Sequence, residues 1–420
     1  MTAYPSSAFT RGDAYPRKRG GRSRVHERVQ SFGWVIVIFV ACCASARAFD
    51  FNGVQVHGFA TQGLFWTSHN RMFGRSDNNV SPDFTELGLN GSWSPLPKLR
   101  ISMQVLSRRA GKGQDGTPTI DFGLLDYSPW DTEDFRLGVR LGRVRLPYGI
   151  YNDTRDVAFT RPSILLPQSI YFERTRNLAL SADGAMFYGE ARGNIGTLTA
   201  EFGATLPRLN DRDTELAILG PTLKGHLESD VMFIGRLLYE SQPAGLRLAF
   251  TGTEIPTFYH SPLGSGEPTI NASATFSAWI LSAQYQTENW TFTSEYALRS
   301  FKRNGFGPTD GVAHGESYYF QAAYRFAPKW EFMGRYDALY NNRNDPYGYG
   351  YQENFGAPSF TQFAQDWTVG LRYDVTPSIM TRLEYHNVTG TGWLPIQDNP
   401  DRNAAVKHWD MVAFLVSFRF

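Results

Sequence analysis

Apolar and polar residues alternate one by one along most of this chain, in stretches of about 10–14 residues. A period of two indicates a β-strand, because successive side chains of a strand point to opposite faces. These stretches are separated alternately by short turns, such as "GNIG", and by long polar loops. Sixteen strands are predicted, at residues 53–67, 82–94, 98–108, 118–128, 134–145, 178–192, 197–206, 227–240, 245–255, 273–287, 290–302, 316–327, 329–341, 365–375, 378–391 and 407–420.

The strand number and the loop lengths together predict how the sheet is closed. An even number of antiparallel strands, joined alternately by short turns and long loops, is typical of a single-chain outer-membrane barrel. The first and last strands are then neighbours, and their pairing removes the open edges that lipid cannot solvate. We therefore expect residues 49–420 to form an all-β domain, a transmembrane antiparallel β-barrel of about 16 strands.

The two faces of each predicted strand differ in polarity. In 365–375, Trp367 and Leu371 share one face, and Arg372 and Asp374 share the other. The pattern alone does not say which face points outward, because a soluble β-sandwich would expose its polar face. Tryptophans near strand ends favour a membrane, since aromatic rings prefer the bilayer interface. These tryptophans are Trp66, Trp93, Trp290, Trp330, Trp367 and Trp409.

The last residues, "DMVAFLVSFRF", form an alternating strand that ends on an aromatic ring. One face carries Val412, Phe414, Val416, Phe418 and Phe420, and we expect it to point into lipid. A terminal Phe with apolar residues at alternate upstream positions also resembles the C-terminal assembly signal of Gram-negative outer-membrane proteins. That resemblance implies insertion by the barrel-assembly machinery, with Phe414, Val416, Phe418 and Phe420 as the signal.

Composition excludes a helical membrane protein. Mean hydropathy is −0.35 and 42% of the residues are apolar. No apolar run approaches the roughly 18–20 residues that a membrane helix needs. Aromatic residues make up 15% of the chain and glycines number 40, which fits a barrel whose strands alternate between lipid and water.

Residues 1–48 have the pattern of a secretory signal peptide. A basic region is followed by a short apolar run at 35–44 and by an A-x-A cleavage site at Ala46 and Ala48. The apolar run is too short for a membrane anchor. A lipoprotein site at Cys42 is a weaker alternative, because the residues before it match the usual lipobox poorly.

Removal of the signal peptide changes both the cysteine count and the charge. The two cysteines, Cys42 and Cys43, lie within 1–48, so the mature chain would form no disulfide and hold no thiolate-bound metal. Residues 1–48 hold 8 of the 41 basic and 2 of the 40 acidic residues, which leaves a net charge of −5. An affinity for nucleic acid is not indicated.

The longest predicted loop, 146–177, follows the fifth strand. The stretch "LGRVRLPYGIYND" at its start resembles the same region of the phosphate-selective and dicarboxylate-type 16-stranded porins. The resemblance implies an outer-membrane porin, assembled as a homotrimer, whose third loop folds back into the pore and narrows it. In the phosphate-specific members lysines form a basic ladder, and few lysines stand in the matching region here.

The same loop is rich in apolar residues, which a loop in free solution would not carry. Packing on the inner wall would bury them; packing at a subunit interface or over the barrel mouth are the alternatives. These residues are Ile164, Leu165, Leu166, Pro167, Ile170, Tyr171 and Phe172.

Arginines are the candidate functional residues. Arginine in a narrow, partly desolvated pore lowers the barrier for anions. We hypothesise a cationic pore constriction built from the fifth strand and the long loop, comprising Arg136, Arg140, Arg143, Arg155, Arg161, Arg174 and Arg176. The alternative is local neutralisation, with Arg155 paired to Asp153 or Asp156 and Arg174 paired to Glu173, which would leave a weakly charged pore.

No catalytic constellation is recognisable. The histidines are scattered, and neither HExxH nor GxSxG occurs, so an enzyme, a cofactor and a metal centre are not predicted. "NNRNDPYGYGYQEN", in the seventh loop, could hold Ca²⁺ at the surface, but a solvated turn is the favoured interpretation.

Two functions are consistent with these patterns. The first is a porin of the Gram-negative outer membrane, embedded among its lipid and lipopolysaccharide, that passes small hydrophilic and preferentially anionic solutes. The second is a structural or adhesive outer-membrane barrel with a closed lumen, whose long loops form the active surface.

Overall fold

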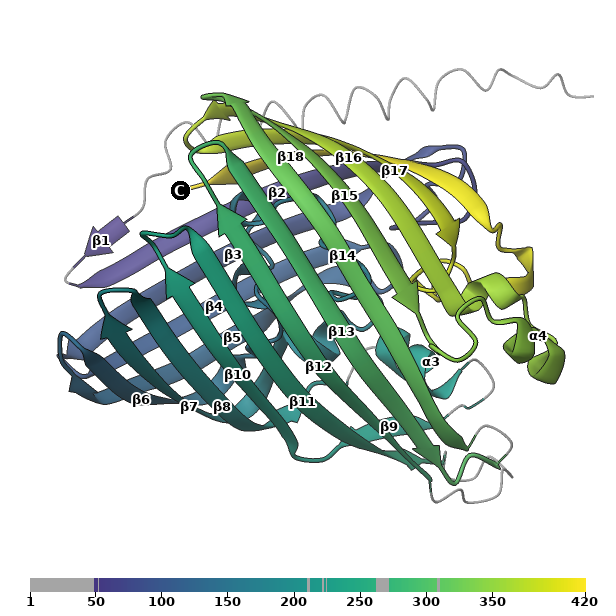
Figure 1. The fold of residues 1–420 in the computed structure, drawn as a ribbon, viewed down its shortest axis with the longest axis horizontal. Helices are drawn as coiled ribbons and strands as arrows, with labels where there is room; N and C mark the ends of the chain where they lie inside the picture. Colours follow the sequence, from purple (N-terminus) through teal and green to yellow (C-terminus); the bar gives the residue numbers. More distant parts are fainter. Residues whose placement is uncertain are drawn as a thin grey trace, which may run out of the picture. The chain divides into compact units, whose positions relative to one another are not determined.

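The structure is a computed structural model that describes residues 49–51, 53–209, 212–220, 223, 225–261, 272–307 and 310–420 (Figure 1). The predicted signal peptide, with Ala46 and Ala48, lies outside the described residues.

The described residues form one closed antiparallel sheet. Its wall has sixteen strands, and two short strands, β1 (Phe49–Phe51) and β9 (His226–Ser229), pair with β2 and β11 at its ends. The wall strands are β2 (Val54–Thr67), β3 (Val80–Leu96), β4 (Leu99–Ala110), β5 (Gln114–Asp131), β6 (Phe135–Arg145), β7 (Ser181–Gly193), β8 (Gly196–Pro207), β10 (Met232–Ser241), β11 (Leu246–His260), β12 (Ala272–Gln286), β13 (Trp290–Asn304), β14 (Gly311–Ala327), β15 (Trp330–Tyr340), β16 (Phe363–Thr376), β17 (Ile379–Gly390) and β18 (His408–Arg419).

In the described part of the chain, helices are few and short, and they lie in the long loops. The α-helices there are α2 (Arg176–Leu180), α3 (Arg212–Leu219) and α4 (Tyr349–Phe355). Single 3₁₀ turns are η1 (Asn152–Thr154), η2 (Ala158–Thr160), η4 (Ser359–Gln362) and η5 (Arg402–Ala404).

The closure of the sheet between its first and last wall strands is confirmed. β18 pairs antiparallel with β2, with Phe414 opposite Leu64. The terminal residue is tied in as well, because Phe420 N donates to Gly58 O at 3.0 Å and Gly58 N donates to Phe420 O at 3.2 Å. Phe420 also stacks with Phe418 at 6.0 Å between ring centroids. The chain end is therefore part of the wall.

One predicted strand is corrected by the structure. Residues 227–240 form two strands, because β9 pairs with β11 alone whereas β10 pairs with both β8 and β11. β8 ends at Pro207, which has no N–H to continue a ladder. Beyond that point β11 continues to His260, five residues past its predicted end, and β9 covers its free edge.

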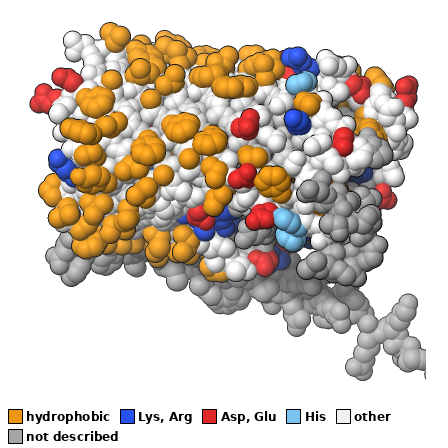
Figure 2. Space-filling view, turned by 90° about the horizontal axis from the view of Figure 1, so that it is seen from below, with side chains coloured by type: hydrophobic (Ala, Val, Ile, Leu, Met, Phe, Trp, Pro, Cys, Tyr) orange, Lys and Arg blue, Asp and Glu red, His pale blue; other side chains and the backbone are white. Residues whose placement is uncertain are grey.

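The alternation of faces is confirmed along the wall. On β16, Trp367 is 63% exposed while the neighbouring Thr368 is buried, and on β14 Phe320 is 60% exposed while Gln321 is buried. In the left half of Figure 2 hydrophobic side chains dominate the outer surface and charged ones are sparse. A closed barrel with an apolar exterior is suited to a bilayer, and this is an outer-membrane β-barrel. We take the short turns to be periplasmic and the long loops to be extracellular, as in other barrels of this kind.

None of the helices in the described part of the chain is long and apolar enough to cross a membrane.

The interior of the wall is less polar than the sequence suggested. Two clusters of buried apolar side chains lie inside it, and each combines wall residues with residues of the long loop after β6. The first joins Leu146, Ile150 and Ile170 to Met186, Ile234 and Ile280. The second joins Phe159, Ile164 and Leu165 to Met380, Met411 and Leu415. These contacts position the loop and with it the candidate site.

Candidate functional site

The candidate site is built on residues 146–180, which connect β6 to β7 and are called here the interior segment. Its apolar side chains occupy the two clusters described above, and its polar groups bond to inward side chains of the wall. Four buried carboxylates on β13, β3, β17 and β15 accept hydrogen bonds from it: Glu295 from Ile150 N at 3.2 Å, Glu86 from Arg161 at 3.1 Å, Glu384 from Ile164 N at 2.6 Å, and Asp337 from Ser169 N at 3.3 Å.

Arginines on β10, β15 and β17 bond to carbonyl and hydroxyl groups of the same segment. Arg236 donates to Gly149 O at 2.9 Å, Arg335 to Ser163 Oγ at 2.8 Å and to Leu165 O at 3.0 Å, and Arg382 to Arg161 O at 3.0 Å. Because these groups belong to strands spread around the barrel, the segment is fixed on several sides at once.

The segment also extends far along the barrel. It leaves the wall at the extracellular end of β6, yet the ring of Phe159 lies 4.2 Å below the Arg419 guanidinium, at the periplasmic end of β18. Arg372 donates to Phe159 O at 3.4 Å. A close approach near the start of the segment requires glycine, since Gly149 has φ +62° and an added Cβ would collide with the Tyr171 hydroxyl.

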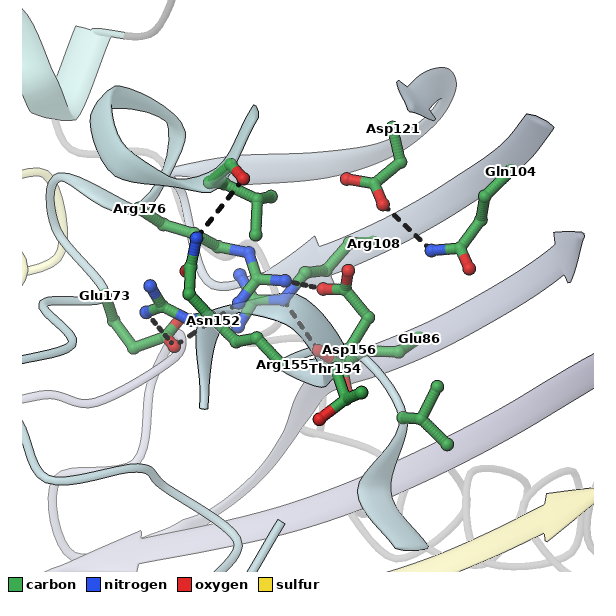
Figure 3. Close-up of polar contacts among 12 residues, drawn as sticks. Glu86, Gln104, Arg108, Asp121, Asn152, Thr154, Arg155, Asp156, Glu173 and Arg176 are labelled. Carbon is green, nitrogen blue, oxygen red and sulfur yellow. Dashed lines mark hydrogen bonds and ion pairs between the residues drawn. The ribbon is translucent and has the colours of Figure 1, made fainter. Parts of the chain in front are cut away.

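Five arginines and four carboxylates meet where the interior segment contacts β3, β4, β5 and the end of β6. Figure 3 shows Arg108, Arg155 and Arg176 among them, with the four carboxylates. This arginine cluster comprises Arg108, Arg145, Arg155, Arg161 and Arg176 with Glu86, Asp121, Asp156 and Glu173. Arg108 bridges Glu86 at 2.9 Å and Glu173 at 2.6 Å, and Arg155 reaches Glu173 at 2.9 Å. Arg145 and Arg176 both pair with Asp156, and Arg145 also pairs with Asp121.

The cluster has one more positive than negative group, and its side chains are almost fully buried. Burial opposes ionisation of Glu173, but the Arg108 and Arg155 guanidiniums outweigh it and hold the pKa of Glu173 below its ordinary value. Burial, reinforced by repulsion from Arg108 and Arg155, lowers the pKa of Arg176. The geometry therefore stabilises a dense, slightly cationic network that joins loop to wall.

Arg136 and Arg140 lie elsewhere, on the inward face of β6 toward its periplasmic end. They are called here the wall arginines, and their side chains are 30% and 31% exposed. Both guanidiniums stack on the ring of Tyr188, at 5.4 and 4.5 Å. Arg136 faces Asp131 at 3.7 Å, and Arg140 lies 3.4 Å from Asp126.

A chain of ion pairs links Arg140 to the interior segment. Arg140 approaches Glu201 at 3.3 Å, Arg236 binds Glu201 at 2.6 Å, and Arg236 also binds Asp153 of the segment at 2.8 Å. A change of charge at Arg140 is thus connected electrostatically to the position of the segment.

Arg143 is not brought together with the other predicted arginines. It shares the parity of Leu141, which points outward, and it pairs with Asp183 at 2.7 Å on β7. Strand alternation explains this, because Arg143 is an odd number of residues from Arg136 and Arg140. Arg145, the last residue of β6, departs from the alternation and pairs with Asp156 of the interior segment.

Arg174 lies at the extracellular end of the segment, beside two small pockets that are open to solvent. Its guanidinium is 5.7 Å from the centroid of the Phe172 ring. The first pocket is also lined by Arg176 and Asn177, and the second by Asn399 and Arg402.

The ion pair proposed from the sequence for Arg155, as part of the neutral alternative, is wrong in its partner. Glu173 takes Arg155, Asp153 takes Arg236, and Asp156 takes Arg176 and Arg145. Asp153 lies within the 3₁₀ turn η1 and Arg155 directly follows it, and helical neighbours two residues apart do not face each other. Neutralisation itself is extensive, but it uses residues that are distant in sequence.

Several residues of the site were missed in the sequence: Glu86, Arg236, Glu295 and Asp337. A usable signal existed, because each is a charged residue on the inward parity of a predicted strand. What the sequence did not contain was the pairing of those residues with the long loop.

The histidine on β17 has carboxylate and hydroxyl neighbours but does not belong to a group of metal-ligating side chains. His386 Nδ1 lies 2.8 Å from Asp366 Oδ2 and 3.0 Å from Thr368 Oγ1. Within the described part of the chain, no three His, Cys, Asp or Glu side chains gather so as to hold a metal ion.

Comparison with known proteins shows which solved structures share this fold. No family model and no curated protein matches the sequence. Among solved structures, an anion-selective porin from Comamonas acidovorans aligns with a TM-score of 0.56 at 13% identity, over 87% of this chain and 99% of that one.

Two further structures align over similar lengths. The outer membrane channel DcaP of Acinetobacter baumannii gives a TM-score of 0.55 at 11% identity, over 89% of this chain and 100% of that one. OmpT, an outer membrane protein of Vibrio cholerae in a trimer form, gives 0.53 at 11% identity, over 87% and 99%. The chain therefore has the fold of the 16-stranded outer-membrane porins.

Proposed function

We propose that this protein is an outer-membrane porin through which small hydrophilic, preferentially anionic, solutes diffuse. The observation that carries the proposal is the presence of two groups of arginines inside a porin-type barrel: the arginine cluster, with five guanidiniums against four carboxylates, and the wall arginines, whose side chains are about one-third exposed. The likeness to an anion-selective porin and to DcaP, an outer membrane channel, supports it at the level of fold.

In this proposal the interior segment narrows the lumen and the arginines have different tasks. Arg136 and Arg140 line the periplasmic approach, and Arg174 lines the extracellular one. Arg155, Arg161 and Arg176 are too buried to touch a passing solute, so they fix the segment and contribute a positive potential. Low-dielectric surroundings strengthen that potential relative to open water.

The assembly partners are also proposals. A homotrimer is supported by the trimer form of the similarly folded OmpT. The outward face that ends in Phe418 and Phe420 fits a signal read by the barrel-assembly machinery, and the apolar wall fits an outer membrane containing lipopolysaccharide. No enzymatic activity, cofactor or metal is proposed.

A second function is favoured by one specific observation. The two apolar clusters inside the wall resemble a protein core, which is what a structural or adhesive barrel with a closed lumen would contain. Single-channel recording in planar bilayers separates the two functions. Steps of conductance that scale with KCl concentration support the porin, whereas an intact, inserted barrel that passes no current supports the closed barrel.

Ion preference is tested by the reversal potential under a KCl gradient. We expect the wild type to prefer chloride, and Arg136→Ala/Arg140→Ala to lose part of that preference. Arg143→Ala is the matched control, because Arg143 pairs with Asp183 on the outward parity. A wild-type pore that prefers potassium, or a double variant with unchanged preference, would contradict the proposed selectivity.

A further inference from the structure

The inner face of the wall is buried all the way round the barrel. A wall that lines a water-filled channel keeps inward side chains in contact with water. Among the described residues, the lumen is instead filled rather than only narrowed. Each of the sixteen wall strands carries an inward side chain that is at most 3% exposed, in strand order Thr61, Glu86, Gln104, Asp121, Val144, Met186, Thr205, Ile234, Thr251, Ile280, Ala297, Tyr319, Arg335, Thr368, His386 and Ala413.

The interior segment fills the lumen by crossing it. The segment leaves from β6 and returns to β7, the fifth and sixth wall strands, but its middle binds β15 and β17, the thirteenth and fifteenth. In a wall of sixteen strands these lie on the opposite side. Arg335 on β15 donates to Ser163 Oγ at 2.8 Å, and Glu384 on β17 accepts from Ile164 N at 2.6 Å. Residues 163–171 are all buried.

The segment has two parts with different contacts. Its ends, residues 146–152 and 170–180, are called here the stem. They are tied to each other, since Asn152 of one end donates to Ala179 O of the other at 2.7 Å, and they pack in the first apolar cluster. Its middle, residues 157–165, is called here the tip, and it packs in the second apolar cluster on the far wall. The tip is therefore the part that closes the lumen against the far wall.

Charged side chains carry the polar part of the contact between the tip and the wall. Besides Arg335 and Glu384, Arg382 donates to Arg161 O at 3.0 Å. The Nε atoms of Arg335 and Arg382 are buried without a hydrogen-bond partner among the described residues. Such donors are costly in a dry contact, and buried charges stabilise a contact no better than apolar groups of the same volume. Release of the tip would let water reach these groups.

We propose that the tip is a gate. In this structure it closes the lumen against β15, β17 and β18, and solutes pass when it leaves that wall while the stem stays packed in the first cluster. A fixed loop that only narrows an open pore does not account for a wall that is buried all round. This inference rests on the proposed function, because a barrel without permeation needs no gate.

Thiol labelling of conducting channels tests the gate. The two cysteines of the chain lie in 1–48, so the processed protein can carry one introduced cysteine at a time. Ala413→Cys lies on β18 in the second cluster, where the tip packs, and Ala297→Cys lies on β13 in the first cluster and is the matched control. Both alanines face inward and are 0% exposed. The probe is methanethiosulfonate-ethyltrimethylammonium, a charged reagent that requires an accessible thiolate, added on either side of a planar bilayer during current recording.

We expect position 413 to react while the channel conducts and position 297 to stay unreactive. The added group should prevent the tip from returning, so the modified Ala413→Cys channel should lose its closures. No reaction at either position in a conducting channel would overturn the gate and leave the porin function standing. Reaction at 297, with or without reaction at 413, would show that the stem leaves the wall, which also overturns the gate as proposed.

A wild-type barrel that is folded and inserted but silent would overturn the proposed function and the gate together, which distinguishes that failure from the others. Heat-modifiable migration shows whether each variant is folded. If Ala413→Cys does not fold, Ser163→Cys provides a second position within the tip, because sulfur there replaces a single oxygen atom. We expect it to react as 413 does, and its protection in a conducting channel would contradict the gate.

Discussion

The arginine cluster and the wall arginines contain the same side chain in one barrel, but their surroundings differ. Arg155, Arg161 and Arg176 are buried and bonded to carboxylates from both loop and wall. Arg136 and Arg140 are about one-third exposed and rest on Tyr188. A buried, multiply paired arginine holds structure together, whereas a partly hydrated one on a pore wall acts on passing ions. Residue type alone therefore does not identify a pore residue.

The largest expected effect comes from removing a carboxylate of the arginine cluster. Glu86→Ala leaves Arg108 and Arg161 buried without their shared partner, and breaking a buried pair in this way costs about 3–5 kcal/mol. Denaturant unfolding of the reconstituted barrel measures this loss. Asp131→Ala, which removes the exposed partner of Arg136, is the control and should cost no more than about 1 kcal/mol. Equal costs for the two variants would contradict the distinction between the groups.

The next effect concerns the fixed path of the interior segment. Gly149→Ala introduces a Cβ at φ +62°, against the Tyr171 hydroxyl and within 2.7 Å of Glu295 Oε1. Strain of this kind costs on the order of 1–3 kcal/mol, and the segment would have to shift. The matched control is Gly356→Ala in the loop after α4, which has φ +67° but no heavy atom near the added Cβ. Stability and single-channel conductance should both change more for Gly149 than for Gly356.

The difference between the two groups also limits what the sequence can predict. All sixteen wall strands were predictable, because a period of two is a local property and closure follows from the even count. The partners of Arg155 and Arg161 were not, because Glu173 and Glu86 approach them only after the loop has folded inside the wall. Glu86 is 75 residues from Arg161 in the chain, and no local sequence pattern predicts their contact.

The apolar interior was missed for a related reason. Met411, Ala413 and Leu415 alternate with lipid-facing residues, so β18 is apolar on both faces. Sequence alternation in 407–420 separated the two faces of the strand, with Phe414 exposed and Phe418 buried on the predicted lipid face. It did not indicate that the other face packs against protein. The inward face of β18 packs against apolar residues of the interior segment.

Acidification should loosen the arginine cluster more than the wall arginines. The pKa of Glu173 is held below its ordinary value of about 4.5, so its stabilising effect is fully present above that pH. It is lost as the pH falls below about 4.5 and through the folded-state pKa. Glu173→Gln should flatten this part of the stability–pH curve. An unchanged acid limb in that variant would show that Glu173 does not couple folding to pH.

The smallest expected effect is a change in ion preference on removal of Asp131. It tests the wall arginines sharply, because the preference should shift in the opposite direction from the shift caused by removing Arg136. Asp131 lies 3.7 Å from Arg136 and is 51% exposed, so Asp131→Ala should barely change stability. It does, however, remove a negative charge beside the proposed path, which leaves the Arg136 charge less screened. The reversal potential under a KCl gradient should therefore move toward stronger anion preference, while Arg136→Ala moves it the other way. The shift should shrink at high salt, since the Debye length falls from about 10 Å at 0.1 M to about 3 Å at 1 M. Shifts of the same sign in both variants would mean that Arg136 and Asp131 do not act on permeating ions through their charge.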